Sequence, residues 1–267
     1  MSTIIYPSPI FGPVHSRRLG ISLGINLMPA DGKICTINCI YCECGLNEDH
    51  RPAQPRPTRE LVAEKLEAKL KEMTADGQLP DVLTFAGNGE PTCHPHFAEI
   101  IGDTIRLRDQ YCPKAKVSVL SNATMIQHQK VHDALMRADN NIQKLDTVSP
   151  DYINKVDRPC GGYDVNAVIE HLKAFRGHVI IQTMFMRGTV QSSMVNVQCS
   201  MVNVDNTGEA FVGPWLDAIR EIRPSQVMVY TIDRETPAQG LQKASREQLD
   251  AIRDRVMALG IPCQASY

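Results

Sequence analysis

A regular alternation of strand-like and helix-like segments constrains the fold of this 267-residue chain more than any other feature. Short runs rich in apolar residues predict strands at 21–27, 81–86, 116–120, 144–148, 179–186 and 226–231. Apolar residues at helical spacing predict helices at 58–73, 97–108, 125–136, 165–175, 209–222 and 245–259. A last short strand is predicted at 261–264.

Alternating strands and helices favour an α/β fold, in which a parallel sheet lies under an outer layer of helices. About six such units fit a partial or complete (β/α) barrel. In barrels of this type the functional site lies at the C-terminal ends of the strands. No low-complexity tract interrupts the pattern, so we expect a single domain over residues 1–267.

The composition excludes several classes of protein. The chain is 43% hydrophobic with a formal net charge of -2, which is unlike the basic field of a dedicated nucleic-acid binder. It shows no export signal and no apolar stretch that approaches the ~18 residues of a membrane span. Nine cysteines without an export signal indicate a reducing compartment, and we expect the protein to be cytoplasmic and not bound to a membrane.

Three thiols lie within eight residues, directly after the first predicted strand. Cys35, Cys39 and Cys42 are spaced by four and three residues. Thiolates are soft ligands that select iron–sulfur clusters, zinc or copper(I). Three thiols would leave one iron of a cubane cluster without a protein ligand. A zinc site with Cys44 as the fourth ligand is the alternative, although zinc ligands usually form two separated pairs.

Polar residues lie at the predicted ends of the other strands. A barrel would bring these residues together at one mouth. The glycine-rich segment 87–90 can approach a ligand closely, and Glu90 provides a carboxylate that can bind an ammonium group. The remaining candidates are hydrogen-bonding or charged residues, namely Ser121, Asn122, Lys144, Asp146, Gln182 and Arg234.

Each of these candidates also has a structural interpretation. Glycines after a strand often form only a turn. Lys144 and Asp146 are candidate catalytic residues, and they would equally form a structural salt bridge inside the barrel. Arg234 is a third catalytic candidate, or a solvated surface charge. Arg17 and Arg18 are likewise either solvated surface charges or residues that bind an anionic substrate.

Two motifs together resemble the radical S-adenosylmethionine (SAM) superfamily. Cys35, Cys39 and Cys42, with the aromatic Tyr41 before the last thiol, resemble its cysteine signature. Gly87-Asn88-Gly89-Glu90-Pro91 resembles its glycine-glycine-glutamate-proline motif, with Asn88 as a departure. Residues 16–20 and 42–45 further resemble a subgroup related to wyosine-base synthases. The resemblance covers about residues 12–235, which leaves 236–267 as a C-terminal extension of helix and strand.

The resemblance implies a 4Fe–4S cluster on the three cysteines, with SAM on the fourth iron. Glu90 and the backbone of 87–89 would receive the amino group of SAM. Ser121 and Asn122 would contact its ribose or carboxylate, the backbone of Tyr41 its adenine, and Gln182 is a further cofactor contact. One electron then cleaves SAM to methionine and a 5′-deoxyadenosyl radical, which abstracts hydrogen from the substrate. A flavodoxin-like or ferredoxin-like reductase is the implied electron donor.

The substrate stays open at this point. A small molecule, peptide or protein is the first hypothesis, and it includes the activation of a glycyl-radical enzyme. The second hypothesis is tRNA base modification, suggested by the wyosine-related subgroup. A non-catalytic iron–sulfur or zinc-binding protein is the third. The long polar segment 187–208 is expected to be a loop that covers the substrate.

Overall fold

A computed structural model describes residues 3–16, 20–191 and 201–267. Its main sheet has eight strands in the order β1-β2-β3-β4-β5-β6-β9-β11. All neighbours from β2 to β11 are parallel, and only β1 pairs antiparallel, with β2. The strands are β1 (Ile10–Ser16), β2 (Gly20–Ile25), β3 (Val82–Phe85), β4 (Lys116–Ser121), β5 (Asn140–Lys144), β6 (Ile180–Met184), β9 (Gln226–Tyr230) and β11 (Cys263–Ser266).

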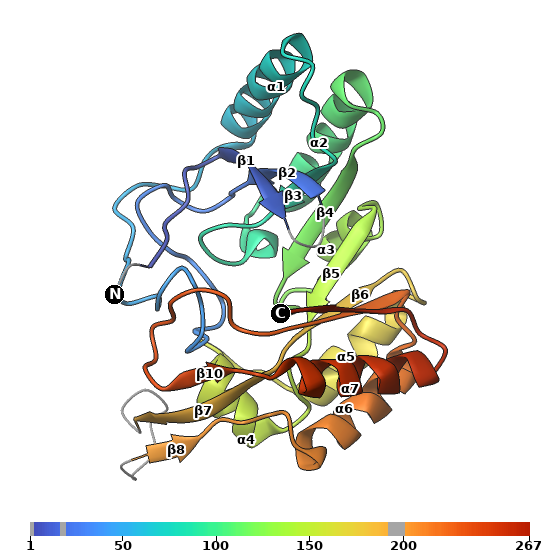
Figure 1. The fold of residues 1–267 in the computed structure, drawn as a ribbon. Helices are drawn as coiled ribbons and strands as arrows, with labels where there is room; N and C mark the ends of the chain where they lie inside the picture. Colours follow the sequence, from blue (N-terminus) through green and yellow to red (C-terminus); the bar gives the residue numbers. More distant parts are fainter. Residues whose placement is uncertain (1–2, 17–19, 192–200) are drawn as a thin grey trace.

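Helices cover the outer side of this sheet (Figure 1). Their buried residues form one apolar core with alternate strand residues such as Leu23, Phe85, Val119 and Ile181. The longer helices are α1 (Arg59–Ala75), α2 (Phe97–Tyr111), α3 (Gln129–Leu135), α5 (Val165–Ala174), α6 (Glu209–Ile222) and α7 (Arg246–Ala258). This arrangement confirms the predicted α/β fold as a partial barrel, because β1 and β11 are the two edges of the sheet.

The inner side of the sheet is mixed in polarity. Ser22 and Thr84 are hydrogen-bonded across β2 and β3 at 2.8 Å, and both are buried. Ile142, Ile180 and Met228 form a small apolar cluster on β5, β6 and β9. Side chains alternate between the two faces of a strand, so Lys144, Gln182 and Tyr230 follow these residues on the inner side. The polar candidates therefore lie at the C-terminal ends of the strands.

Several predicted boundaries are wrong, and the strand predicted at 261–264, for example, is β11 at Cys263–Ser266. The strand predicted at 144–148 is β5 at Asn140–Lys144, so Asp146 follows the strand instead of lying within it. The amide side chains of β5 hide it from a sequence pattern, and its two asparagines donate to distant parts of the chain. Asn141 donates to the carbonyl of His178 at 3.0 Å, for example. The helix predicted at 125–136 is shorter and spans Gln129–Leu135.

Several elements were not predicted. β1 lies before the first predicted strand, in a segment for which no strand was predicted. A short helix α4 (Pro150–Tyr152) continues into a π-helical turn, Ile153–Asp157. A second, three-stranded sheet contains β7 (Met186–Gln191), β8 (Met201–Asn203) and β10 (Leu241–Lys243).

The segment 187–208, predicted as a covering loop, thus contains most of β7 and all of β8, which pair antiparallel. Residues 192–200, and also Arg17 and Arg18, lie outside the described part of the chain. Among the described helices, none is both long and apolar enough to span a membrane.

Candidate functional site

The cysteines lie on a long loop between β2 and α1, which we call the cysteine loop (residues 26–58). It pairs with the segment after β3, the glycine loop (residues 86–90). The amide of Ile34 donates to the carbonyl of Asn88 at 3.0 Å, and the amide of Glu90 donates to the carbonyl of Ile34 at 3.1 Å. Gly89 makes this approach possible. A Cβ at Gly89 would lie 1.8 Å from the carbonyl oxygen of Ile34, and its φ of +134° disfavours any other residue.

The three cysteines of the motif come together on this loop. Cys39 is buried, while Cys35 and Cys42 are partly exposed. The thiols are close enough for the charge on each to affect the others, and burial raises the pKa of Cys35 to about 12. In the described part of the chain, no three His, Cys, Asp or Glu side chains are arranged closely enough to hold a single metal ion. Three soft donors on one loop suit a polynuclear cluster whose thiolates bind different irons.

A buried cation accompanies these thiols. Lys33 is 3% exposed and donates to the carbonyl of Gly45 at 2.6 Å. Burial alone would lower the pKa of Lys33, but the neighbouring Cys42, Cys35 and Cys39 raise it above the usual value. An ammonium group in this position compensates the negative charge that three thiolates would bring.

Cys44 lies behind the motif. Its Sγ lies 3.4 Å from the carbonyl of Gly87, and its thiol also contacts Cys42. The hydrogen bond from Cys44 lowers the pKa of Cys42 to about 6. Cys44 therefore supports a neighbouring thiolate and connects the cysteine loop to the glycine loop.

Glu90 is 2% exposed and lies between two strand ends. One carboxylate oxygen accepts from the amide of Thr92 at 3.0 Å, and the other accepts from the amide of Asn122 at 2.7 Å. Burial raises its pKa above the usual value. A carboxylate in this environment gains from a nearby cation, such as the ammonium group of an amino acid.

Ser121 and Asn122 follow β4 and face the cysteine loop. The amide nitrogen of the Asn122 side chain lies 3.5 Å from Sγ of Cys35 and 2.8 Å from the hydroxyl of Thr36. Ser121 accepts from the amide of Ala123 at 3.1 Å and contacts Glu90. The structure thus brings the motif thiols, Glu90 and the end of β4 together.

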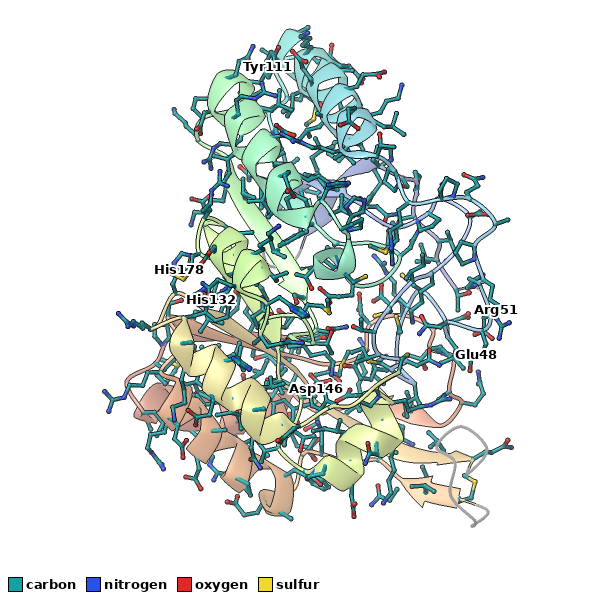
Figure 2. All side chains as sticks on the ribbon, turned by 180° about the vertical axis from the view of Figure 1, so that it is seen from behind. Glu48, Arg51, Tyr111, His132, Asp146 and His178 are labelled. Carbon is teal, nitrogen blue, oxygen red and sulfur yellow. The ribbon has the colours of Figure 1, made fainter. Side chains whose placement is uncertain are left out.

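Lys144 and Asp146 form a buried ionic network with Asp157. The ammonium of Lys144 lies 2.7 Å from Asp157 and 3.0 Å from Asp146. Tyr41 donates its hydroxyl to Asp146, and Sγ of Cys39 lies 3.8 Å from Asp157. Figure 2 shows Asp146 in the interior of the molecule. Burial raises the pKa of Asp157 to about 6, although Lys144 opposes this shift. Lys144 and Asp146 thus form the salt bridge that was one of their two interpretations.

A pocket of about 250 Å³ opens beside this network. Its lining includes Tyr41 and Cys42 from the cysteine loop, Gln182 from β6 and Tyr230 from β9. Gln182 thus lines the same cavity as Cys42 of the cysteine motif.

Two candidates lie elsewhere. The side chain of Asn88 is fully buried and is held by the backbone of Tyr6 and Pro29, so it points away from the thiols. Arg234 is exposed. It forms an ion pair at 2.8 Å with Glu43, which lines the pocket, and donates to the hydroxyl of Tyr6 at 2.9 Å.

Sequence reasoning missed Asp157 and assigned no role to Lys33. Asp157 lies in the π-helical turn, far along the chain from the cysteines, and no motif marks it. Lys33 had one available signal, since it is a lysine two residues before a cluster of thiols.

A family model described as the Radical SAM superfamily matches residues 31–196, which is more than half of the chain. The chain therefore belongs to the radical SAM superfamily. This family uses a 4Fe–4S cluster and SAM, and the matched range includes the cysteine motif, the glycine loop and the ionic network.

Particular relatives share most of this chain. A Brachyspira hyodysenteriae protein named GTPase Obg is 28% identical over 254 residues, covering 93% of this chain and 32% of that protein. A UPF0026 protein of Helicobacter pylori is 30% identical over 229 residues, covering 84% of this chain and 66% of that protein. The chain thus spans less than two thirds of the length of either relative.

Among solved structures, SuiB of Streptococcus suis bound to its precursor peptide SuiA has the same fold. It matches with a TM-score of 0.62 and 14% identity, over 91% of this chain and 48% of that one.

Proposed function

We propose that this chain is a radical SAM enzyme that cleaves SAM reductively and abstracts hydrogen from a small molecule, peptide or protein. The observation that carries the proposal is the pairing of the cysteine loop with the glycine loop. This pairing places Cys35 3.5 Å from the side chain of Asn122, whose backbone amide in turn lies 2.7 Å from Glu90.

In this proposal Cys35, Cys39 and Cys42 hold a 4Fe–4S cluster. When bound, such a cluster supplies the electron that cleaves SAM to methionine and a 5′-deoxyadenosyl radical. Glu90 receives the amino group of SAM, assisted by the backbone of the glycine loop, and its buried carboxylate has few competing solvent partners. Ser121 and Asn122 provide hydrogen bonds for the ribose or carboxylate.

The cavity beside the thiols would hold the rest of the cofactor and the substrate. Tyr41 lines this cavity and would offer its backbone to the adenine, and Gln182 would offer an amide for hydrogen bonding. Apolar residues that include Tyr41, Tyr152 and Met184 surround Cys39 and exclude water from this side. Lys144, Asp146 and Asp157 fix the side chain of Tyr41. Arg234 fixes Glu43, which lines the cavity.

Other parts of the proposal concern the whole molecule. We propose one domain over residues 1–267, since a continuous core includes Leu23 near one end and Ile261 near the other. We also propose a cytoplasmic location, and a flavodoxin-like or ferredoxin-like reductase as electron donor.

A peptide is the substrate class to test first, because SuiB, which has the same fold, binds a peptide. The tRNA alternative has less support, since the net charge of -2 provides no general attraction to a polyanion.

The test is made on anaerobically purified and reconstituted protein. Iron and sulfide content are measured first, followed by release of 5′-deoxyadenosine from SAM with dithionite. We expect about four irons per chain and release of the nucleoside. Cys39→Ala should lose both, whereas Cys263→Ala on β11 should keep both. Stoichiometric zinc without nucleoside release would overturn the proposal.

A further inference from the structure

The departure from the glycine motif at Asn88 has a structural partner. The side-chain oxygen of Asn88 accepts from the amide of Tyr6 at 2.8 Å, and its nitrogen donates to the carbonyl of Tyr6 at 2.9 Å. The same nitrogen donates to the carbonyl of Pro29 at 3.0 Å. Asn88 is 0% exposed, so these contacts satisfy a side chain that has no access to water.

The segment that Asn88 holds is formed by residues 3–9, which we call the strap. A second buried asparagine holds it as well. Asn26 donates to the carbonyls of Tyr6 and Pro7, both at 3.2 Å, and its backbone amide donates to the carbonyl of Pro9 at 2.8 Å. In Figure 1 the strap and the cysteine loop, both in blue, lie together on one side of the sheet.

The strap crosses the part of the cysteine loop that follows Cys42. The amide of Ile4 donates to the carbonyl of Glu43 at 2.9 Å. Thr3 contacts the ring of His50 at 2.5 Å, and it packs so tightly on Gly45 that a Cβ there would meet its methyl group at 3.2 Å. Arg234 ties Tyr6 and Glu43 together from the end of β9.

Three segments therefore meet at one residue. The backbone of Asn88 pairs with the cysteine loop through Ile34, and its side chain pairs with the strap through Tyr6. A glycine at this position, as in the family motif, would keep the first pairing and lose the second.

We propose that Asn88 is a positioning residue that fastens the strap across the cysteine loop and so shields the iron–sulfur cluster from chelators and oxidants. This inference rests on the proposed function, because it assumes a cluster on Cys35, Cys39 and Cys42. Solvent exposure is one of the factors that set the reduction potential of such clusters. Removing the side chain of Asn88 alone would leave its backbone partners without these buried hydrogen bonds, which is costly.

The experiment compares two pairs of proteins. Asn88→Gly, which restores the family residue, is compared with wild type. Tyr6→Pro, which removes the amide that Asn88 binds, is compared with Tyr6→Ala, which keeps that amide. Circular dichroism first establishes that each variant is folded. Hydrogen exchange of residues 3–9 is measured without iron, and the rate of iron release to a chelator is measured after reconstitution.

We expect Asn88→Gly and Tyr6→Pro to lose protection over residues 3–9 and to release iron roughly tenfold faster than their partners. Loss of protection with unchanged iron release would overturn the shielding role. Unchanged protection in Asn88→Gly would overturn the strap itself. If wild-type protein takes up no iron, the proposed function and the shielding role both fail, and exchange still decides whether Asn88 fastens the strap.

Discussion

Sγ of Cys39 lies 3.8 Å from Oδ1 of Asp157, although 118 residues separate the two along the chain. The same carboxylate oxygen lies 2.7 Å from the ammonium of Lys144, which also contacts Asp146 at 3.0 Å. Although burial opposes a charge on Lys144, the two aspartates hold its pKa well above the usual value. One largely buried cation thus lies between two buried carboxylates beside a proposed cluster ligand.

Removing this cation should destabilise the protein strongly. We expect Lys144→Met to lower the free energy of unfolding by about 3 kcal/mol, because it leaves two buried carboxylates without their counter-ion. Urea unfolding of the metal-free protein measures this. The control is Lys173→Met, since Lys173 pairs with Glu170 at 2.7 Å but is 36% exposed. Its loss should cost less than about 1 kcal/mol. Equal effects of the two variants would contradict a structural role for the network.

Lys33 should influence the reduction of the cluster. A buried ammonium next to the thiolates stabilises the additional negative charge of the reduced state. We expect Lys33→Met to lower the equilibrium constant for reduction about tenfold, which is ~59 mV for one electron. Redox titration followed by electron paramagnetic resonance measures the shift. Lys33→Arg keeps the charge and is the control, and a potential unchanged in Lys33→Met would refute the prediction.

Gly89 should tolerate no side chain. In Gly89→Ala the new Cβ would overlap the carbonyl of Ile34, and the pairing of the cysteine and glycine loops would have to open. We expect a loss of about 3 kcal/mol in unfolding free energy, together with loss of iron uptake. Gly161→Ala is the matched control, because a Cβ added at Gly161 would meet nothing within 4 Å. Wild-type stability in Gly89→Ala would show that the loops are held in another way.

His94 should make the protein less stable in mild acid. Its Nε2 donates to the carbonyl of Pro57 at 3.0 Å, and its Nδ1 accepts from the amide of His96 at 3.1 Å, so the neutral ring satisfies both partners. Burial lowers its pKa below the usual value. Above about pH 6.5 the ring is neutral in both states, and below it the unfolded chain binds the proton more readily.

The contribution of His94 to stability is therefore complete above about pH 6.5 and is lost as the pH falls towards its lower folded pKa. Unfolding free energies measured from about pH 7.5 to about pH 5 should show a weaker pH dependence in His94→Asn than in wild type. His128→Asn, at an exposed position, controls for the removal of a histidine. Parallel profiles for wild type and His94→Asn would contradict the prediction.

The regular parts of the fold were predictable because their signals are local. Helix α7 begins at a capping box formed by Ser245 and Gln248, close to its predicted start. Strand β5 was misplaced because the side chains of its two asparagines, Asn140 and Asn141, donate to distant parts of the chain. The antiparallel strand β1 was missed because a bulge between Phe11 and Val14 interrupts its pairing with β2 and so breaks the alternation of a regular strand.

The sequence by itself determined the α/β alternation, the cysteine motif and the glycine loop, because each depends on residues that are neighbours along the chain. Only the tertiary structure decided which side chains surround those motifs. Asp157 reaches Cys39 through the π-helical turn, Lys33 is enclosed next to the thiols, and Asn88 is bound to Tyr6. These contacts join segments whose distance depends on how the whole sheet and its helices pack, and no local pattern of residues encodes that packing.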